Sequence, residues 1–205
     1  YTALQREIRR MASVFRRKRR IRVESEAGTD VEFITGDRWI LEDNGICNRP
    51  GQIANLPAGK VFVLPKEKSM KGTIVIDGSW DGRMLEDPLS FQIEEGLVTG
   101  ISGGELAEEI SEVFEVAKSG VRVTRRDLVW TVAEFGFGMN PKATELVGNK
   151  VEDLVVRGSS YFGFGDNSHI GGGARVGIHL RGSLIGPEIT LEDSVIVSEG
   201  KISVR

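Results

Sequence analysis

Hydrophobic positions recur with helical spacing in two parts of the chain. The first stripe predicts a helix over residues 2–18 and consists of Leu4, Ile8, Met11 and Phe15. The second stripe predicts a helix over residues 105–118 and consists of Leu106, Ile110, Val113, Phe114 and Ala117. Gly104 precedes and Gly120 follows this second segment, as is common at helix ends. We therefore expect two amphipathic helices.

Elsewhere the pattern changes to short stretches in which apolar and polar residues alternate, as in strands with one buried face. Residues 21–25 and 31–35 are of this kind, and residues 27–30 between them predict a hairpin turn. Further strands are predicted at residues 39–41, 61–64, 73–77, 89–93, 97–101, 128–134, 160–164, 176–183 and 189–197. A mostly helical connection is predicted between Pro141 and about Val155. Short connections favour antiparallel pairing, so we expect an α+β fold of mostly antiparallel strands in two packed lobes.

Composition places the chain among soluble globular proteins. Its 205 residues are 40% hydrophobic and 28% charged. No apolar run approaches the roughly 20 residues that a membrane-spanning helix needs, and no signal peptide is visible. The single cysteine, Cys47, excludes an internal disulfide and is expected to pack in the core. A protein of this kind is expected in the reducing cytoplasm.

The charge of the chain is divided unevenly. Residues 1–23 contain nine basic residues and one acid, Glu7, which gives +8 and leaves −11 for the rest of a chain with net charge −3. This basic segment has two interpretations: a surface for nucleic acid or an acidic partner, or a solvated helix face. The second is favoured, because neither aromatic stacking residues nor a groove-reading motif accompanies the arginines. We expect residues 1–20 to form a basic N-terminal helix and residues 21–205 to form the C-terminal domain.

The C-terminal region has the layout of a metal-binding strand, glycine-rich loop and second strand. Residues 158–173 contain nine glycines or serines, and His179 and Arg181 follow on the next predicted strand. Side chains two residues apart on a strand share one face. A His-x-Asp pair would place two metal ligands there, but a guanidinium has no lone pair free for a metal.

Five segments, taken in order, resemble one family: residues 28–30, 55–62, 134–141, 158–165 and 178–186. They resemble the metal-bearing C-terminal half of the thermophilic metallo-aminopeptidases, the aminopeptidase T and aminopeptidase S group. A ring-cleaving dihydroxypyridine dioxygenase branch shares that fold. The resemblance covers residues 20–205 and implies a homodimer, a Zn, Mn or Co centre where the family site is retained, and an N-terminal domain that is absent from this sequence.

Most of the metal ligands that the resemblance implies are replaced in this chain. Glu134 and His179 stand where the family has a glutamate and a histidine ligand. The other family positions hold Lys60 for a glutamate, Tyr161 for a histidine, Ser168, with His169 beside it, for an active-site tyrosine, and Arg181 for an aspartate. Replacing two acids by two bases moves the formal charge of the site four units toward positive, which opposes binding of a divalent ion.

We therefore expect a degenerate dimetal site that is non-catalytic or binds a small anion, with Lys60 and Arg181 neutralising Glu134. The expected ligand-binding residues are Lys60, Glu134, Tyr161, His169, His179 and Arg181. No metal is expected, and if one binds, Glu134 and His179 are its expected ligands.

Three alternatives remain open at this point. The cluster of charges could be closed and bind nothing. A rebuilt ligand set, Glu134 and His179 with His169 or Asp166, could support an active metal-dependent aminopeptidase or hydrolase. The basic N-terminal helix could bind nucleic acid or an acidic partner. Whether the protein is an enzyme is not decided by the sequence.

Overall fold

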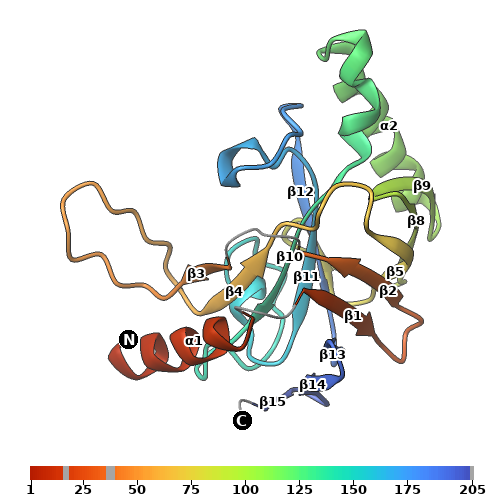
Figure 1. Ribbon diagram of the computed structural model, residues 1–205. Coiled ribbons are helices and arrows are strands. Elements are labelled where there is room, and N and C mark those ends of the chain that lie inside the picture. The colour runs from red at the N-terminus through yellow and green to blue at the C-terminus, as the bar shows by residue number, and fades with distance from the viewer. Residues whose placement is uncertain (16–18, 36–39, 204–205) are drawn as a thin grey trace.

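The computed structural model, which describes residues 1–15, 19–35 and 40–203, contains two antiparallel sheets packed on each other (Figure 1). The larger sheet has the strand order β15-β14-β13-β1-β2-β5-β8-β9. Its strands are β1 (Arg20–Glu24), β2 (Asp30–Ile34), β5 (Lys71–Ile76), β8 (Leu89–Glu94), β9 (Leu97–Ser102), β13 (Glu188–Leu191), β14 (Ser194–Ser198) and β15 (Lys201–Ile202).

The smaller sheet has the strand order β3-β4-β10-β11-β12-β6-β7. Its strands are β3 (Leu41–Asp43), β4 (Lys60–Val63), β6 (Ser79–Trp80), β7 (Arg83–Met84), β10 (Val132–Gly138), β11 (Ser160–Gly165) and β12 (His179–Leu184). All neighbouring pairs in this sheet are antiparallel. The central strands β4, β10, β11 and β12 carry the residues considered below.

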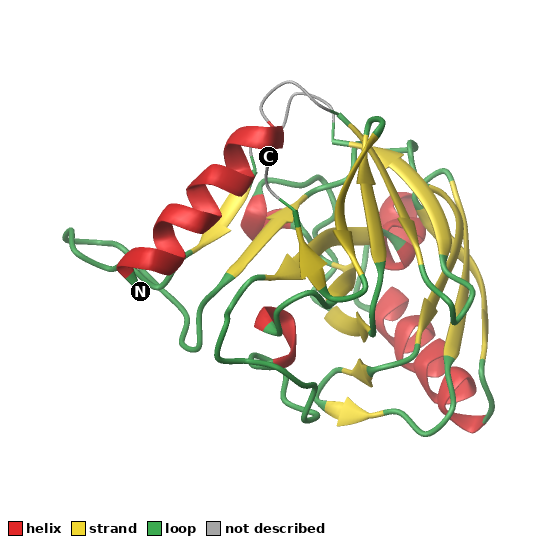
Figure 2. Ribbon diagram, turned by 90° about the horizontal axis from the view of Figure 1, so that it is seen from below, coloured by secondary structure: helices red, strands yellow, loops and turns green. Residues whose placement is uncertain are grey.

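Two α-helices lie at opposite ends of the molecule (Figures 1 and 2). Helix α1 (Thr2–Phe15) contacts β3 and β4, and its Phe15 ring stacks on Phe137 at 6.3 Å. Helix α2 (Glu105–Ser119) packs on β9 and on the 3-10 helix η1 (Val123–Trp130). Two more 3-10 helices complete the description: η2 (Asp153–Val155) and η3 (Ser168–Ile170).

The core between the sheets follows from the alternation of side chains along β10 and β11, which an irregularity between Val132 and Glu134 interrupts. Phe135 on β10 and Phe164 on β11 face the larger sheet. There Phe135 meets the ring of Phe33 at 5.4 Å, and Phe164 stacks on Phe91 at 4.7 Å. Burying each such ring contributes roughly 2–3 kcal/mol. Because the side-chain period is two, the residues that alternate with these phenylalanines along each strand project from the opposite face of the sheet.

The structure confirms the expected α+β class and its mostly antiparallel strands. Three local predictions are wrong. The strand predicted at 128–134 begins at Val132 and continues to Gly138, because its glycines alternate with core phenylalanines instead of ending the strand. The strand predicted at 189–197 is a hairpin of β13 and β14, whose turn includes Glu192 with positive φ. The connection before Val155 is mostly irregular, with only the short η2.

A long connection between β3 and β4 extends away from the rest of the molecule (Figures 1 and 2). Cys47 lies in this segment and is exposed, so the expectation that it packs in the core is wrong. Ile53 and Leu56 in the same segment are also exposed. No helix in the described part of the chain is long and apolar enough to cross a membrane.

Candidate functional site

The face of the smaller sheet that points away from the core has a floor of glycine. Glu134 on β10 is paired with Gly163 on β11, and Gly163 is paired with Arg181 on β12. Because Gly163 has no side chain, Glu134 and Arg181 meet above it. A Cβ atom at Gly163 would lie 2.6 Å from Cγ of Glu134 and 3.1 Å from Nε2 of His179. The glycine is therefore required for the three side chains to converge.

Glu134 is the centre of this convergence. Arg181 donates from Nε to Oε1 of Glu134 at 2.5 Å, and Nε2 of His179 lies 3.2 Å from the same oxygen. Only 2% of the Glu134 side chain is exposed. Burial by itself raises the pKa of Glu134, but the hydrogen bond from His179 and the charge of Arg181 outweigh it and lower the pKa to about 2. The carboxylate is thus ionised at neutral pH.

The backbone orients His179 toward that carboxylate. Nδ1 of His179 lies 2.6 Å from the carbonyl oxygen of Asp166. A carbonyl and a carboxylate both only accept hydrogen bonds, so Nδ1 donates to Asp166 and Nε2 donates to Glu134 when the ring carries both protons. These two bonds fix the orientation of the ring, and a metal could bind Nε2 only after that nitrogen had lost its proton.

Lys60 does not pair with Glu134 as expected from the sequence; its ionic partner is Asp43. The Lys60 ammonium lies 3.7 Å from Oδ2 of Asp43, and each side chain is 8% exposed. Burial lowers the pKa of Lys60, and the charges of Asp43 and Glu134 oppose that effect only in part. Asn55 also approaches Oδ2 of Asp43, at 3.5 Å.

Asp43 is the functional-site residue that the sequence did not indicate. It precedes Asn44 and Gly45 and has the local sequence of a turn acid. Only the pairing of β3 with β4 places it directly opposite Lys60. The signal in the sequence was indirect: a buried lysine requires a nearby acid.

Tyr161 lies between the two ion pairs. Its residue is 1% exposed, and its ring lies against Gly136, where a Cβ would be 2.5 Å from Cε1. The Lys60 ammonium is 5.8 Å from the centroid of this ring. The Tyr161 hydroxyl has no hydrogen-bond partner among the described residues. Burial, and after it the charge of Glu134, raises the pKa of Tyr161 well above its ordinary value.

His169 lies at the rim of the cluster. It is exposed in η3. Its ring and the His179 ring make a T-shaped contact, with centroids 5.2 Å apart and an interplanar angle of 88°. The loop around it is organised by Asp166, whose carboxylate accepts hydrogen bonds from Ser168, Val176 and Gly177. Burial raises the pKa of Asp166, but these bonds outweigh it and hold the pKa well below the ordinary value. The Asp166 carboxylate therefore stabilises the conformation of this loop.

The six predicted residues are thus brought to one side of one sheet, in two adjacent groups. His179 and Arg181 both bond to Glu134, and His169 lies against His179. Lys60 and Tyr161 adjoin them, and the charges of Glu134 and Arg181 influence the pKa of both. We call all these residues together with Asp43 the polar cluster.

The sequence matches the family described as NicX: 2,5-dihydroxypyridine 5,6-dioxygenase over residues 1–204. The chain belongs to the NicX family. A curated relative, the 2,5-dihydroxypyridine 5,6-dioxygenase of Pseudomonas putida KT2440, is 25% identical over an alignment covering 93% of this chain and 56% of the relative. The chain therefore spans a little over half the length of this NicX relative.

Solved structures place the NicX-family chain in the same fold. The 2,5-dihydroxypyridine dioxygenase structure from Pseudomonas putida KT2440 has a TM-score of 0.87 and 23% identity, covering 98% of this chain and 60% of that one. AmpT from Thermus thermophilus has a TM-score of 0.74 and 14% identity, covering 99% and 55%. The resemblance to aminopeptidases therefore holds for the fold, and the family is corrected to NicX.

The residues of this NicX-family chain do not fit a divalent metal. A non-haem iron dioxygenase typically holds iron with two histidines and one carboxylate, and a dimetal hydrolase needs more acids. Here Glu134 and His179 converge, but Arg181 is bonded to the carboxylate oxygen that a metal would share. In the described ranges no three His, Cys, Asp or Glu side chains are grouped to hold one ion. A dication beside a guanidinium at ~4 Å would be opposed by several kcal/mol.

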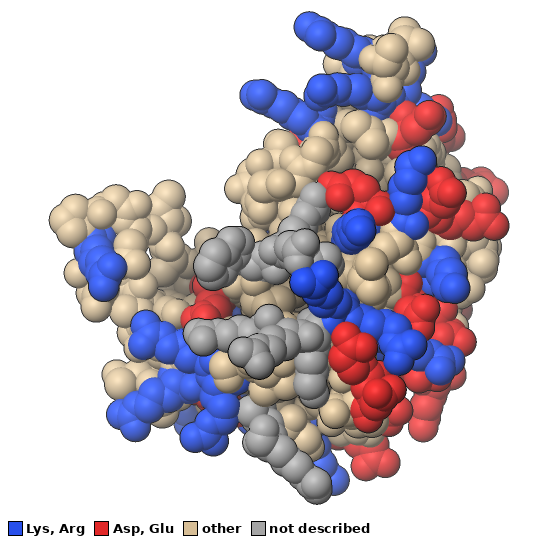
Figure 3. Space-filling model, in the orientation of Figure 1, with Lys and Arg blue, Asp and Glu red and all other residues tan. Residues whose placement is uncertain are grey.

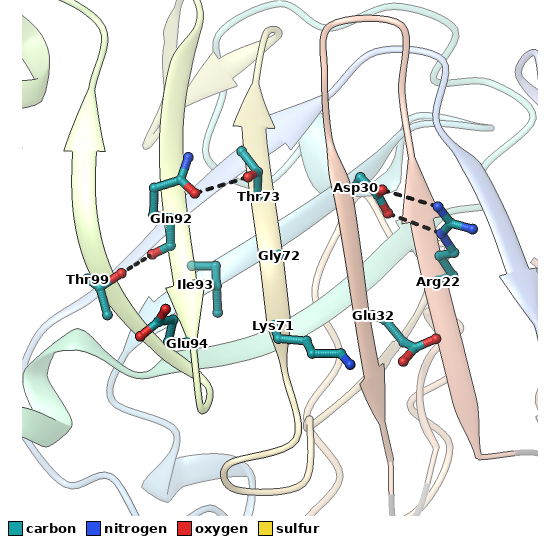
Figure 4. Close-up of a pocket in the computed structure, with 10 residues that line it drawn as sticks. All are labelled: Arg22, Asp30, Glu32, Lys71, Gly72, Thr73, Gln92, Ile93, Glu94 and Thr99. Atoms are coloured by element: carbon teal, nitrogen blue, oxygen red, sulfur yellow. Dashed lines mark hydrogen bonds and ion pairs between the residues drawn. The ribbon is translucent and has the colours of Figure 1, made fainter.

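Two other polar surfaces lie apart from the polar cluster. A hollow of about 570 Å³ lies on the outer face of the larger sheet, where its side chains bond to one another, as in the Arg22–Asp30 pair at 3.1 Å (Figure 4). Basic side chains gather over α1, on which Arg6, Arg9 and Arg10 are exposed (Figure 3). The remaining basic run, residues 16–18, lies outside the described residues.

Proposed function

We propose that this NicX-family chain binds a small carboxylate-bearing anion at Arg181 and that its polar cluster works without a divalent metal. The bond between Arg181 and Glu134 supports this best. It runs through Nε, and no other hydrogen bond of the Arg181 guanidinium is found among the described residues. The side chain is 31% exposed, so its terminal nitrogens remain available to a ligand. A guanidinium held in this way is well suited to a carboxylate.

Charge balance supports an ion-paired cluster in place of a metal centre. Lys60 and Arg181 offset Asp43 and Glu134, and His179 adds a positive charge when it donates to both of its partners. A divalent ion would add two more positive charges to a largely buried group that has no excess of negative charge. A ligand carboxylate, in contrast, needs only the exposed end of Arg181 and the rim at His169.

Isothermal titration with succinate, acetate and benzoate tests this function. We expect millimolar or tighter binding of at least one of these anions to the wild type, and a loss of at least about tenfold in Arg181→Gln. Arg175→Gln is the matched control, because Arg175 is exposed in the neighbouring loop and bonds to none of the cluster. Equal affinities in Arg181→Gln and wild type would overturn the proposal. Absence of binding to every anion would favour a closed ion-pair cluster.

The alternative is a metal-dependent enzyme with a rebuilt ligand set. It is favoured by one observation, the approach of Nε2 of His179 to Glu134. Ring cleavage of 2,5-dihydroxypyridine, the activity in the names of the relatives, and hydrolysis of a leucyl anilide test it. Both assays use protein purified without chelator and supplied with Fe(II), Mn(II), Zn(II) or Co(II). We expect no turnover and no stoichiometric metal.

The basic helix supplies a second candidate function, binding of nucleic acid or an acidic partner. This candidate is supported by the exposure of Arg6, Arg9 and Arg10 on one helix. The one acid of this helix, Glu7, forms an ion pair with Arg157 at 2.6 Å. Binding of this kind weakens steeply with salt. Fluorescence anisotropy with mixed oligonucleotides at low salt decides it, and no detectable binding eliminates it.

A further inference from the structure

Building on the proposed anion site, we propose that Lys60 forms an imine with the carbonyl group of an oxo acid whose carboxylate is bound by Arg181. Anion binding at Arg181 does not involve three groups of the polar cluster: the Lys60 amine, the Asp43 carboxylate and the Tyr161 hydroxyl.

Lys60 has the surroundings of a reactive amine. Its side chain is 8% exposed, and its ion pair with Asp43 is 3.7 Å long, which is beyond hydrogen-bonding distance. The rings of Phe62 and Tyr161 lie 5.6 and 5.8 Å from its nitrogen. Burial lowers the pKa of Lys60, so a larger share of this amine is neutral than in an exposed lysine. A neutral amine is the form that attacks carbonyl carbon.

The Tyr161 hydroxyl is placed to donate a hydrogen bond to a ligand. Its hydroxyl is fully buried and has no partner among the described residues, although an unsatisfied buried hydroxyl costs about 1–3 kcal/mol. Its high pKa keeps the phenol protonated. A ligand oxygen between Lys60 and Tyr161 would accept this unused hydrogen bond.

The register of the sheet sets the length of the ligand. Lys60 is paired with Gly138, four residues along β10 from Glu134, and Arg181 lies three strands from Lys60. This spacing favours an acid in which carbon atoms separate the carbonyl from the carboxylate over a 2-oxo acid, in which the two groups adjoin. An acid with two or more carbon atoms between the two groups suits this separation.

The chemistry balances without a cofactor. The neutral Lys60 amine adds to the carbonyl carbon, and the oxygen that gains the electron pair takes a proton from Tyr161. Nitrogen then loses one proton, which restores the phenol, and the hydroxyl leaves as water with the second amine proton, relayed through Tyr161. The products are one C=N bond and one water molecule, and nothing is oxidised or reduced.

Reductive trapping tests the inference. The full chain is incubated near neutral pH with succinic semialdehyde, or with butanal, which lacks the carboxylate, and sodium cyanoborohydride. Peptide mass spectrometry then measures labelling at each lysine. We expect succinic semialdehyde to label Lys60 at least about tenfold faster than exposed Lys142, and to retain that advantage at lower pH. Butanal should label Lys60 more slowly than succinic semialdehyde does.

The variants separate reactivity from folding. Lys60→Arg keeps the charge and removes the primary amine, so the adduct should disappear, whereas Lys142→Arg should leave it intact. Tyr161→Phe retains the ring and loses an unpartnered hydroxyl, so it should fold at least as stably and label more slowly. Arg181→Gln should slow the labelling of Lys60 by succinic semialdehyde and leave its labelling by butanal unchanged.

Two results would overturn the inference: equal labelling of Lys60 and Lys142, or equal labelling of Lys60 by the two aldehydes. The titration with succinate, acetate and benzoate distinguishes failure of the imine from failure of the proposed function. If at least one of these anions binds at Arg181 and Lys60 is not labelled, the anion site stands and the imine does not form. If none of them binds, both proposals fall.

Discussion

Arg181 donates from Nε to Oε1 of Glu134 directly above Gly163, the residue that separates them in the sheet. This relationship places a fixed cation on a carboxylate that His179 also approaches. It explains why two metal-type donors can converge in a NicX-family chain without providing a divalent metal site.

Replacing the cation by an acid should create a metal site. Arg181→Asp would put a second carboxylate beside Glu134 and His179, a donor set suited to Fe(II), Mn(II) or Zn(II). We expect at least about tenfold tighter metal binding than in the wild type, measured by calorimetry and by metal content after dialysis. Arg175→Asp carries the same charge change on an exposed residue and should have little effect. Equal metal binding in the two variants would contradict the prediction.

Adding one methyl group to the floor should disrupt the cluster. The Cβ of Gly163→Ala would lie 2.6 Å from Cγ of Glu134, inside van der Waals contact, so side chains must shift. We expect destabilisation of about 1–3 kcal/mol in urea unfolding, together with weaker anion binding. Gly100→Ala on β9 is the matched control, because its nearest neighbour would be 3.9 Å away. The idea fails if both alanine variants behave alike.

Glu134 should make stability depend on pH in the acid range. Its pKa is about 2 in the folded chain against an ordinary value of 4.5. Ionised Glu134 therefore stabilises the fold above about pH 4.5, and this contribution, of roughly 3 kcal/mol, is lost as pH falls toward 2.

Chemical denaturation of Glu134→Gln between pH 7 and pH 2 measures this contribution. At neutral pH the variant should be less stable by roughly 3–5 kcal/mol, because Arg181 loses its buried partner. It should also lose less stability than the wild type on acidification. Glu109→Gln, at an exposed position, should keep the wild-type pH dependence. Parallel pH curves for wild type and Glu134→Gln would refute the assigned role.

Asp166 should act as a positioning residue for His179. Its carboxylate accepts backbone hydrogen bonds from Ser168, Val176 and Gly177. Its backbone carbonyl oxygen accepts a hydrogen bond from Nδ1 of His179. Asp166→Asn exchanges one accepting oxygen for a donor. We expect destabilisation of about 1–3 kcal/mol, faster amide exchange at Val176 and Gly177, and weaker anion binding.

A purely structural role for Asp166 would change stability and amide exchange alone. The histidine NMR signals distinguish the two cases, because the ring resonances of a displaced His179 should shift from their wild-type positions. Asp127→Asn, at an exposed position in η1, controls for the change in charge. Unaltered His179 signals in Asp166→Asn would remove the positioning role.

The amino-acid sequence alone determined the fold class and the face on which the site lies. Phenylalanine and glycine alternate along Phe135–Gly138, so one face of β10 had to be apolar and the other nearly flat. Gly104 and Gly120 likewise enclosed α2 where the apolar stripe predicted it. These features are local, since the period of side chains along a strand or helix is fixed by backbone geometry.

The tertiary structure decided the partners. The sequence brought forward Glu134, His179 and Arg181 because they stand in recognisable local patterns, and these three do meet. It could not assign Lys60 to Asp43, because the two are joined through the long connection between β3 and β4 and meet only by strand pairing. Ion-pair partners depend on register between distant strands, and register is set by the packing of the whole sheet.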